Sequence, residues 1–259
     1  MKINVSHNID EVLRKFEALP ARQVPFAMSL ALNRTAKRVE EAWKKEINTV
    51  FDRPTPFTQR APIMFQRATK QDLTAGVKLK DWVGGKGNAP ADYLQPQIHG
   101  GGRLAKRFEY ALRRIGLLWP GEFAVPASGA QLDQYGNLSR GEIARIMSFL
   151  QAFGEQGYSA NMTADKRRKV SRTGVKLKRQ GYGYFVPRHG ADMRDRHLTR
   201  GIWKRSGLHG VDLKPVIMFV TGVNYTPRFD PIGNGQKIIK DMLPVETDRA
   251  IREALETMR

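Results

Sequence analysis

The fold is organised around residues 93–153, which read YLQPQIHGGGRLAKRFEYALRRIGLLWPGEFAVPASGAQLDQYGNLSRGEIARIMSFLQAF. Residues 93–98 include a proline, which restricts the residue before it and predicts a short extended segment. Three glycines at 100–102 then allow a bend that needs no Cβ. From residue 103 onward, apolar side chains recur at three- and four-residue steps. This spacing predicts a helix that ends near Gly116 and Pro120.

A second helix is expected after a turn-rich loop at residues 129–140. Ser139 suits the N-cap of this helix, whose apolar positions are 143, 146, 147 and 150. Long ordered loops in compact proteins are commonly functional. This one contains no nucleophile–base pair and no metal-ligand cluster, so we expect it to make contacts rather than to catalyse a reaction.

The remaining regular elements predict an α+β fold. A long helix is expected at 24–51, with Pro25 in its first turn. Residues 63–65 and 73–79 predict an antiparallel strand pair, and runs at 184–187, 201–204 and 215–220 predict a meander. A terminal helix at 236–258 contains Pro244, which should kink or restart it. The expected fold is therefore an antiparallel β-sheet packed with a long N-terminal helix and a C-terminal helix, with a central helical insertion.

Four segments follow from this pattern. Residues 1–90 hold the N-terminal helices and first strands, and residues 91–160 form the central helical insertion with its long loop. Residues 161–181 form a basic arm, which we interpret as either mobile or an irregular insertion. Residues 182–259 hold the meander and the C-terminal helix, and we expect them to complete the same core as the first segment.

Charge is the most unusual property of the composition. The 259 residues carry a formal net charge of +19, which predicts attraction to nucleic acid, an acidic protein surface or an anionic membrane. Solubility or an acidic neighbouring subunit would explain the excess equally well. The chain has no cysteine, which excludes disulfides and thiolate metal sites. The first residues lack a signal-peptide pattern and no apolar run reaches membrane-spanning length, so we expect cytoplasmic synthesis and no membrane partner.

Catalytic patterns are weak. His189, Asp192, Asp195 and His197 lie close together and could bind a divalent metal, but arginines are interleaved with them and favour a salt-bridged loop. The glycines at 100–102 before a helix could hold an anion at its N-terminus, or they simply make a tight turn. We therefore expect no enzyme, with no catalytic residue, no metal and no cofactor.

Nucleic-acid binding is better supported. The basic run between residues 166 and 179 could neutralise several phosphates without sequence specificity, and the aromatic residues Tyr182, Tyr184 and Phe185 that follow could stack on bases or simply belong to a strand. Further cations lie on the polar face of the central helix. The candidate residues for contact with DNA or an acidic partner are Arg103, Lys106, Arg107, Arg113, Arg114, Lys166, Arg167, Arg168, Lys169, Arg172, Lys176, Lys178 and Arg179.

Several stretches resemble a known family. Residues 24–36, VPFAMSLALNRTA, resemble the opening helix of the minor tail protein Z-like and tail-completion proteins of tailed bacteriophages. The later runs GIW at 201–203, PVIMF at 215–219 and YTPRFD at 225–230, followed by a terminal helix, are similar to that family as well. Residues 93–153 resemble a stretch of prophage structural proteins.

The resemblance implies a structural component of the virion, in the neck or tail, assembled in the host cytoplasm. Proteins of this family form rings or occur in multiple copies where head and tail join, so the implied partners are copies of the chain, neighbouring connector, neck or tail proteins, and the backbone of packaged DNA. The alternative is a non-sequence-specific DNA-binding protein that is not part of the particle.

Overall fold

The structure is a computed structural model that describes residues 23–84, 87–172, 181–187, 197–207 and 210–256. The chain divides into two compact units. The first combines residues 1–101 with residues 225–259, and the second consists of residues 102–224. The second unit is thus an insertion in the sequence of the first. The short strands β3 (Gly101–Gly102) and β8 (Asn224–Tyr225) pair where the chain passes between the units.

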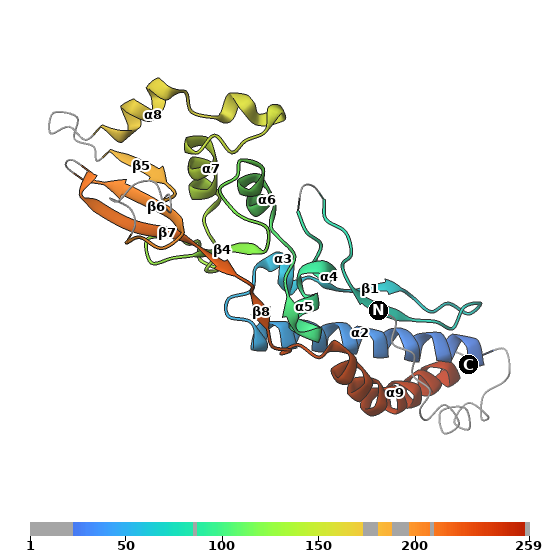
Figure 1. The fold of residues 1–259 in the computed structure, drawn as a ribbon. Coiled ribbons are helices and arrows are strands. Elements are labelled where there is room, and N and C mark those ends of the chain that lie inside the picture. Colours follow the sequence, from blue (N-terminus) through green and yellow to red (C-terminus); the bar gives the residue numbers. More distant parts are fainter. Residues whose placement is uncertain (1–22, 85–86, 173–180, 188–196, 208–209, 257–259) are drawn as a thin grey trace. The chain divides into compact units, whose positions relative to one another are not determined.

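The first unit is mainly helical (Figure 1). Its elements are α2 (Val24–Val50), α3 (Pro56–Gln59), β1 (Pro62–Gln66), β2 (Gly76–Leu79), α4 (Pro90–Tyr93), α5 (Gln95–His99) and α9 (Pro231–Glu256). Strands β1 and β2 form an antiparallel pair. A proline occupies the first turn of α2, α3, α4 and α5, where its fixed φ favours helix entry and its missing N–H costs nothing.

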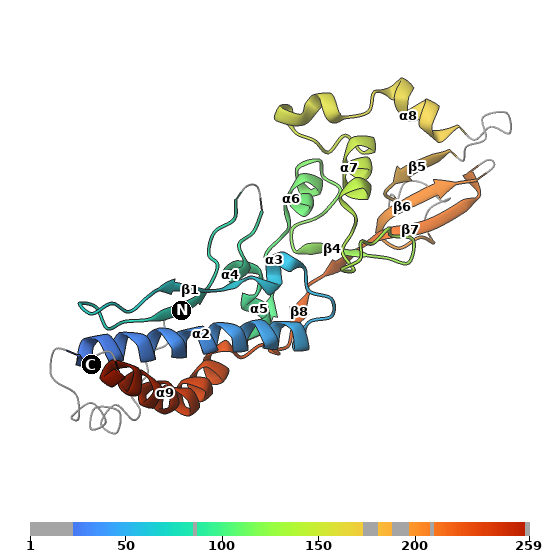
Figure 2. The ribbon, with the colours of Figure 1, turned by 180° about the vertical axis from the view of Figure 1, so that it is seen from behind.

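Helices α2 and α9 pack along each other, as the views in Figures 1 and 2 both show. Their contact is made by small side chains, since Ala27, Ala31, Ala250 and Ala254 are all at most 2% exposed. Small residues let the two backbones approach closely. A second core lies farther along α2, around the large buried side chains of Trp43, Ile47, Leu94 and Phe229.

The second unit holds a four-stranded antiparallel sheet and the helices that cover it. Its elements are α6 (Arg107–Arg114), β4 (Glu122–Pro126), α7 (Arg140–Phe149), the 3₁₀ helix η1 (Glu155–Ala160), α8 (Ala164–Ser171), β5 (Tyr182–Phe185), β6 (Gly201–Ser206) and β7 (Asp212–Thr221). The strand order is β4-β7-β6-β5. Leu112 of α6 and Ile146 of α7 pack with Ile202 and Ile217 of the sheet in one core.

The α+β prediction is confirmed, with its long N-terminal helix, antiparallel sheets and C-terminal helix. The meander is also confirmed, because β5, β6 and β7 pair consecutively in antiparallel register. Pro244 occupies an interior position of α9, and Figure 1 shows that this helix is bent. A proline cannot donate the intrahelical hydrogen bond at its position, which accounts for a bend.

Other local predictions were wrong. Residues 93–98 lie in α4, in α5 and at Leu94, the cap residue between them, rather than in an extended segment, because Pro90 and Pro96 occupy the first turns of these short helices. The helix expected from residue 103 begins only at Arg107. Strand β4 was not predicted. Within the expected basic arm, residues 164–171 form the regular helix α8, whose first turn is capped by the Thr163 side chain.

The units also differ from the four expected segments. The boundaries fall at 101/102 and 224/225. The meander therefore shares a core with α6 and α7, whereas it was expected to complete the core of the first 90 residues.

Candidate polyanion-binding surface

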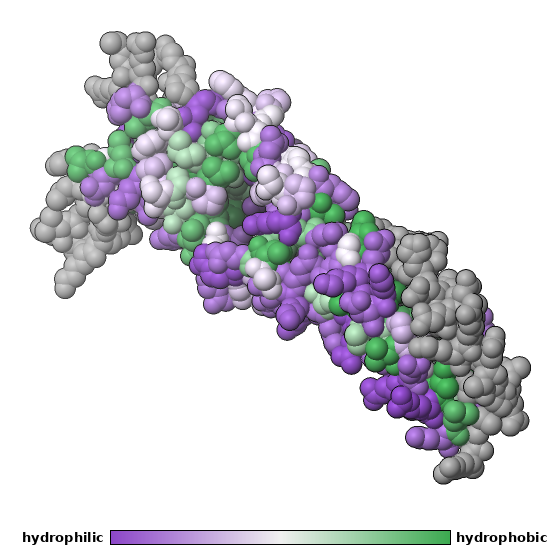
Figure 3. Space-filling view, turned by 90° about the horizontal axis from the view of Figure 1, so that it is seen from below, coloured by the Kyte–Doolittle hydropathy of each residue, from purple (hydrophilic) through white to green (hydrophobic). Residues whose placement is uncertain are grey.

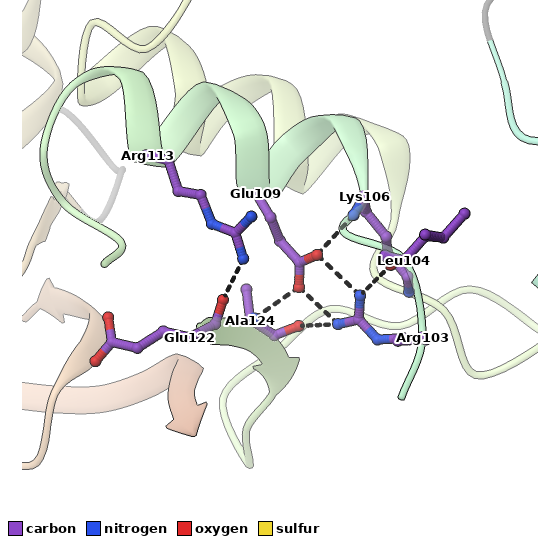
Figure 4. Close-up of polar contacts among 7 residues, drawn as sticks. All are labelled: Arg103, Leu104, Lys106, Glu109, Arg113, Glu122 and Ala124. Carbon is purple, nitrogen blue, oxygen red and sulfur yellow. Dashed lines mark hydrogen bonds and ion pairs between the residues drawn. The ribbon is translucent and has the colours of Figure 1, made fainter. Parts of the chain in front are cut away.

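Arg103, a predicted contact residue, is turned inward (Figure 4). Its guanidinium donates to both carboxylate oxygens of Glu109, at 2.6 and 2.8 Å. Glu109 is fully buried and the Arg103 side chain is only 12% exposed. The carboxylate also accepts the backbone N–H of Lys106 at 2.6 Å and that of Ala124 at 2.7 Å. The positive charge of Arg103 is therefore neutralised inside the unit.

The group around Glu109 protects a sheet edge. Strand β4 is an edge strand, so the backbone groups on its outer side have no neighbouring strand. Glu109 accepts the Ala124 N–H, and Arg113 donates to the Glu122 carbonyl at 2.7 Å. Edge strands left unpaired invite pairing with other chains. We conclude that Glu109 and Arg113 stabilise this edge, and that the anion site considered at the start of α6 is already filled by Glu109.

A second, largely buried ion pair joins Arg200 to Glu122, the first residue of β4. Arg200 donates to the carboxylate of Glu122 at 2.9 and 3.0 Å, and its guanidinium lies 3.5 Å from the ring centroid of Trp119. Burial alone would raise the pKa of the Glu122 carboxyl, but hydrogen bonds from Arg200 and the Trp119 N–H outweigh burial and lower it. For Glu109, the bonds from Arg103 and two backbone N–H groups likewise outweigh burial and lower the pKa.

The remaining candidates on α6 and at its N-cap, Lys106, are more accessible. Lys106, Arg107 and Arg114 are exposed, and Arg114 also donates to the Ala152 carbonyl at 2.7 Å. The expected cationic face of the central helix is therefore reduced to these three residues, because Arg103 and Arg113 are committed to the edge of β4.

Helix α8 presents the densest group of exposed cations among the described residues of the second unit. Lys166, Arg168, Lys169 and Arg172 are exposed, and Arg167 is half-buried. Arg168 pairs with Asp165 at 3.0 Å. The other three residues predicted in this segment, Lys176, Lys178 and Arg179, lie outside the described residues.

The end of α8 is held against β5. A Cβ on Gly181 would stand 2.5 Å from the Arg172 carbonyl carbon, which is closer than real Cβ contacts. Only glycine permits this approach. Because α8 also contacts β5 elsewhere, its cations are presented from a defined place beside the sheet.

The aromatic residues after the basic run have different roles. Tyr184 is buried, and its hydroxyl donates to the buried carboxylate of Glu142 at 3.4 Å. Burial and the Glu142 charge raise the pKa of Tyr184. Tyr184 thus belongs to the core, whereas Tyr182 and Phe185 are half-buried and lie beneath the cations of Lys204 and Arg205, at 5.6 and 4.9 Å. These two β6 cations were not among the candidates predicted from the sequence. They lie in the second half of β6, KRS at 204–206, directly after the apolar residues of the same strand.

Three of the four residues in the histidine cluster, His189, Asp192 and Asp195, lie outside the described residues. The fourth, His197, is described and is exposed. In the described part of the chain, no three His, Asp or Glu side chains are arranged to hold a metal ion. Helices in that part are all too short or too polar to cross a membrane.

Exposed hydrophobic side chains are scattered. The most exposed large ones described in the second unit are Tyr158 at 75%, Val211 at 73%, Leu104 at 64%, Tyr110 at 58% and Trp119 at 54%. On the face seen in Figure 3, hydrophobic residues lie in separate patches among hydrophilic ones.

The residues that carry the phage resemblance have structural contacts in the first unit. The Asn33 side chain forms two 2.8 Å hydrogen bonds with the backbone of Ala68, one as donor and one as acceptor. Arg34 pairs with Glu253 of α9 at 2.7 Å. Comparisons of the chain with protein-family models, with curated proteins and with solved structures find no match.

Proposed function

We propose that the chain is a non-enzymatic structural component of a tailed-phage particle that acts in tail completion or head–tail joining, in a ring or in multiple copies. The observation that carries the proposal is the role of the sequence ALNRTA at 31–36. Ala31 packs against α9, Asn33 binds the backbone at residue 68, and Arg34 pairs with Glu253. The residues that resemble the phage family are thus those that join α2 to its neighbours, which supports a shared architecture.

The proposal is tested by quantitative mass spectrometry on purified particles of the phage or prophage that encodes the chain. We expect a fixed low number of copies relative to the major capsid protein, close to one ring's worth. Absence of the chain from intact particles would refute the virion role.

A second candidate is non-sequence-specific DNA binding outside the particle. It is favoured by α8, where Lys166 and Arg172 are exposed and the acid Asp165 already pairs with Arg168. Such a surface neutralises phosphates and gives salt-dependent affinity.

The role of α8 in either setting is tested by charge reversal. The double variant Lys166→Glu and Arg172→Glu should weaken duplex binding or reduce DNA retention by assembled particles. The matched control is Lys237→Glu and Lys240→Glu, which reverses two exposed charges on α9. Equal DNA binding and equal DNA retention by both double variants would remove α8 from the interface.

A further inference from the structure

A cavity of about 410 Å³ opens beside β5 in the second unit. Its volume lies within the range of about 300–1,000 Å³ that is usual for ligand pockets. It is bounded by α7, α8, the strands β5 and β6 and the turn that follows β6. Its lining includes Phe149, Ser171, Gly183, Phe185, Arg205 and Ser206.

The walls combine aromatic surface with residues that carry no side chain. Phe149 and Phe185 supply apolar rings, and Gly183 of β5 contributes a lining residue without a side chain. A Cβ at Gly183 would stand 3.3 Å from the Phe149 ring and 3.4 Å from the Ser171 hydroxyl. A side chain at this position would therefore reduce the cavity. The lining suits a flat, partly apolar group.

One cation stands at the cavity. Arg205 is exposed, and its guanidinium lies 4.9 Å from the centroid of the Phe185 ring. Within the described part of the chain, no carboxylate forms an ion pair with Arg205. Ser171 and Ser206, which both carry hydroxyl groups, line the same cavity. An arginine with neighbouring hydroxyl groups is suited to a phosphate.

The positive charge continues beyond the cavity. Helix α8 contacts β5, and Lys166 and Arg172 are exposed there. A single phosphate would need only Arg205. The additional cations match a ligand that carries several phosphates in a row.

We propose that this cavity receives one nucleotide of a single-stranded nucleic acid, with its base against Phe185 and its phosphate at Arg205, while the cations of α8 contact the neighbouring phosphates. The proposal rests on the nucleic-acid-binding candidate above and specifies its ligand. A duplex keeps its bases stacked and paired inside the helix, so they do not enter a side cavity. An unpaired base does, and stacking on aromatic side chains is the usual mode of single-strand binding.

The test is fluorescence anisotropy with a labelled oligo-dT strand, a strand of equal length that lacks bases, and a duplex of equal length, all at one salt concentration. The full chain should bind oligo-dT more tightly than either of the other two. Phe185→Leu should weaken oligo-dT binding roughly 5- to 100-fold, the usual effect of losing one stacking interaction, and leave the abasic strand unaffected.

Arg205→Gln should weaken both single strands, because phosphate contacts do not depend on the base. The matched control is Arg252→Gln, an equal charge change at an exposed position of α9, and it should bind as the wild type does. Thermal melting checks that each variant folds. If Phe185→Leu fails to fold, the test is made with Arg205→Gln, because Arg205 is exposed.

Three results would overturn the proposal in distinguishable ways. Equal binding of duplex and single strand, unchanged in Phe185→Leu, would refute the cavity and leave polyanion binding by α8 standing. Binding of free dTMP as tightly as oligo-dT would assign the cavity to a mononucleotide instead. Binding of none of the ligands would refute both the cavity proposal and the nucleic-acid-binding candidate, while the particle role would still be decided by mass spectrometry.

Discussion

Replacing Glu109 by Gln removes a charge from a fully buried side chain while nearly keeping its volume. One carboxylate oxygen accepts Arg103 and the Ala124 N–H, and the other accepts Arg103 and the Lys106 N–H. A glutamine has one oxygen and one NH₂ group. In either orientation the NH₂ group faces two donors, so rotating the amide cannot repair the site.

The cost follows from the burial of the two partners. Arg103 is 12% exposed, so the substitution leaves a nearly buried charge without its partner, which costs about 3–5 kcal/mol. We expect the free energy needed to open β4 to fall by about 4 kcal/mol. Since about 1.4 kcal/mol is a factor of ten, the opening equilibrium should change by roughly a thousandfold.

Hydrogen exchange read by mass spectrometry measures this opening locally, in peptides covering residues 122–126. The Glu109→Gln protein should lose most of its protection there, while peptides of α2 and α9 in the other unit keep theirs. The matched control is Glu155→Gln, which changes an exposed carboxylate in the same unit. Protection of residues 122–126 within tenfold of the wild type would refute the assignment of Glu109 to the sheet edge.

Three further outcomes are expected from the contacts described. The pKa of Glu122 in the folded protein lies below its usual value. The stability that Glu122 contributes is therefore present at neutral pH, and it is lost as the pH falls from about 4 through the folded-state pKa. Denaturant midpoints should fall less steeply with decreasing pH in Arg200→Gln than in the wild type. Asn33→Ala removes both hydrogen bonds to Ala68 and should lower the free energy of unfolding by about 1–3 kcal/mol. Thermal melting should show a lower melting temperature, and an unchanged melting curve would contradict this prediction. Ala250→Leu overfills the α2–α9 contact and should cost about 1–3 kcal/mol in denaturant unfolding, and equal or greater stability would show that the helices can move apart freely.

The sequence predicted best those elements whose signals are local. Ser139 accepts the Glu142 N–H at the start of α7, as its position before an apolar repeat indicated. Helix α2 spans Val24–Val50 against the expected 24–51. Each of these features depends on residues within one or two turns, so a single sequence contains the information.

The errors come from residues whose partners lie elsewhere. Arg103 was expected at the surface because it was assigned to the polar face of the central helix, but the carboxylate of Glu109 six residues later holds it inside. Strand β4 has only five residues and ends at Pro126, and it forms because β7 pairs with it. No pattern in residues 122–126 alone shows that β7 would supply this partner.

The interrupted order of the first unit sets the order in which the protein can fold during synthesis. All elements of the inserted unit have been made before residue 225 appears, so that unit has a complete core to fold early. Helix α2 is synthesised before the inserted unit but completes its packing only after it, because the alanines that cover Ala27 and Ala31 belong to α9. A nascent chain therefore exposes the face of α2 that carries Ala27 and Ala31 until α9 has been synthesised, and this face is where a chaperone, or a second copy of the chain, would bind before α9 does.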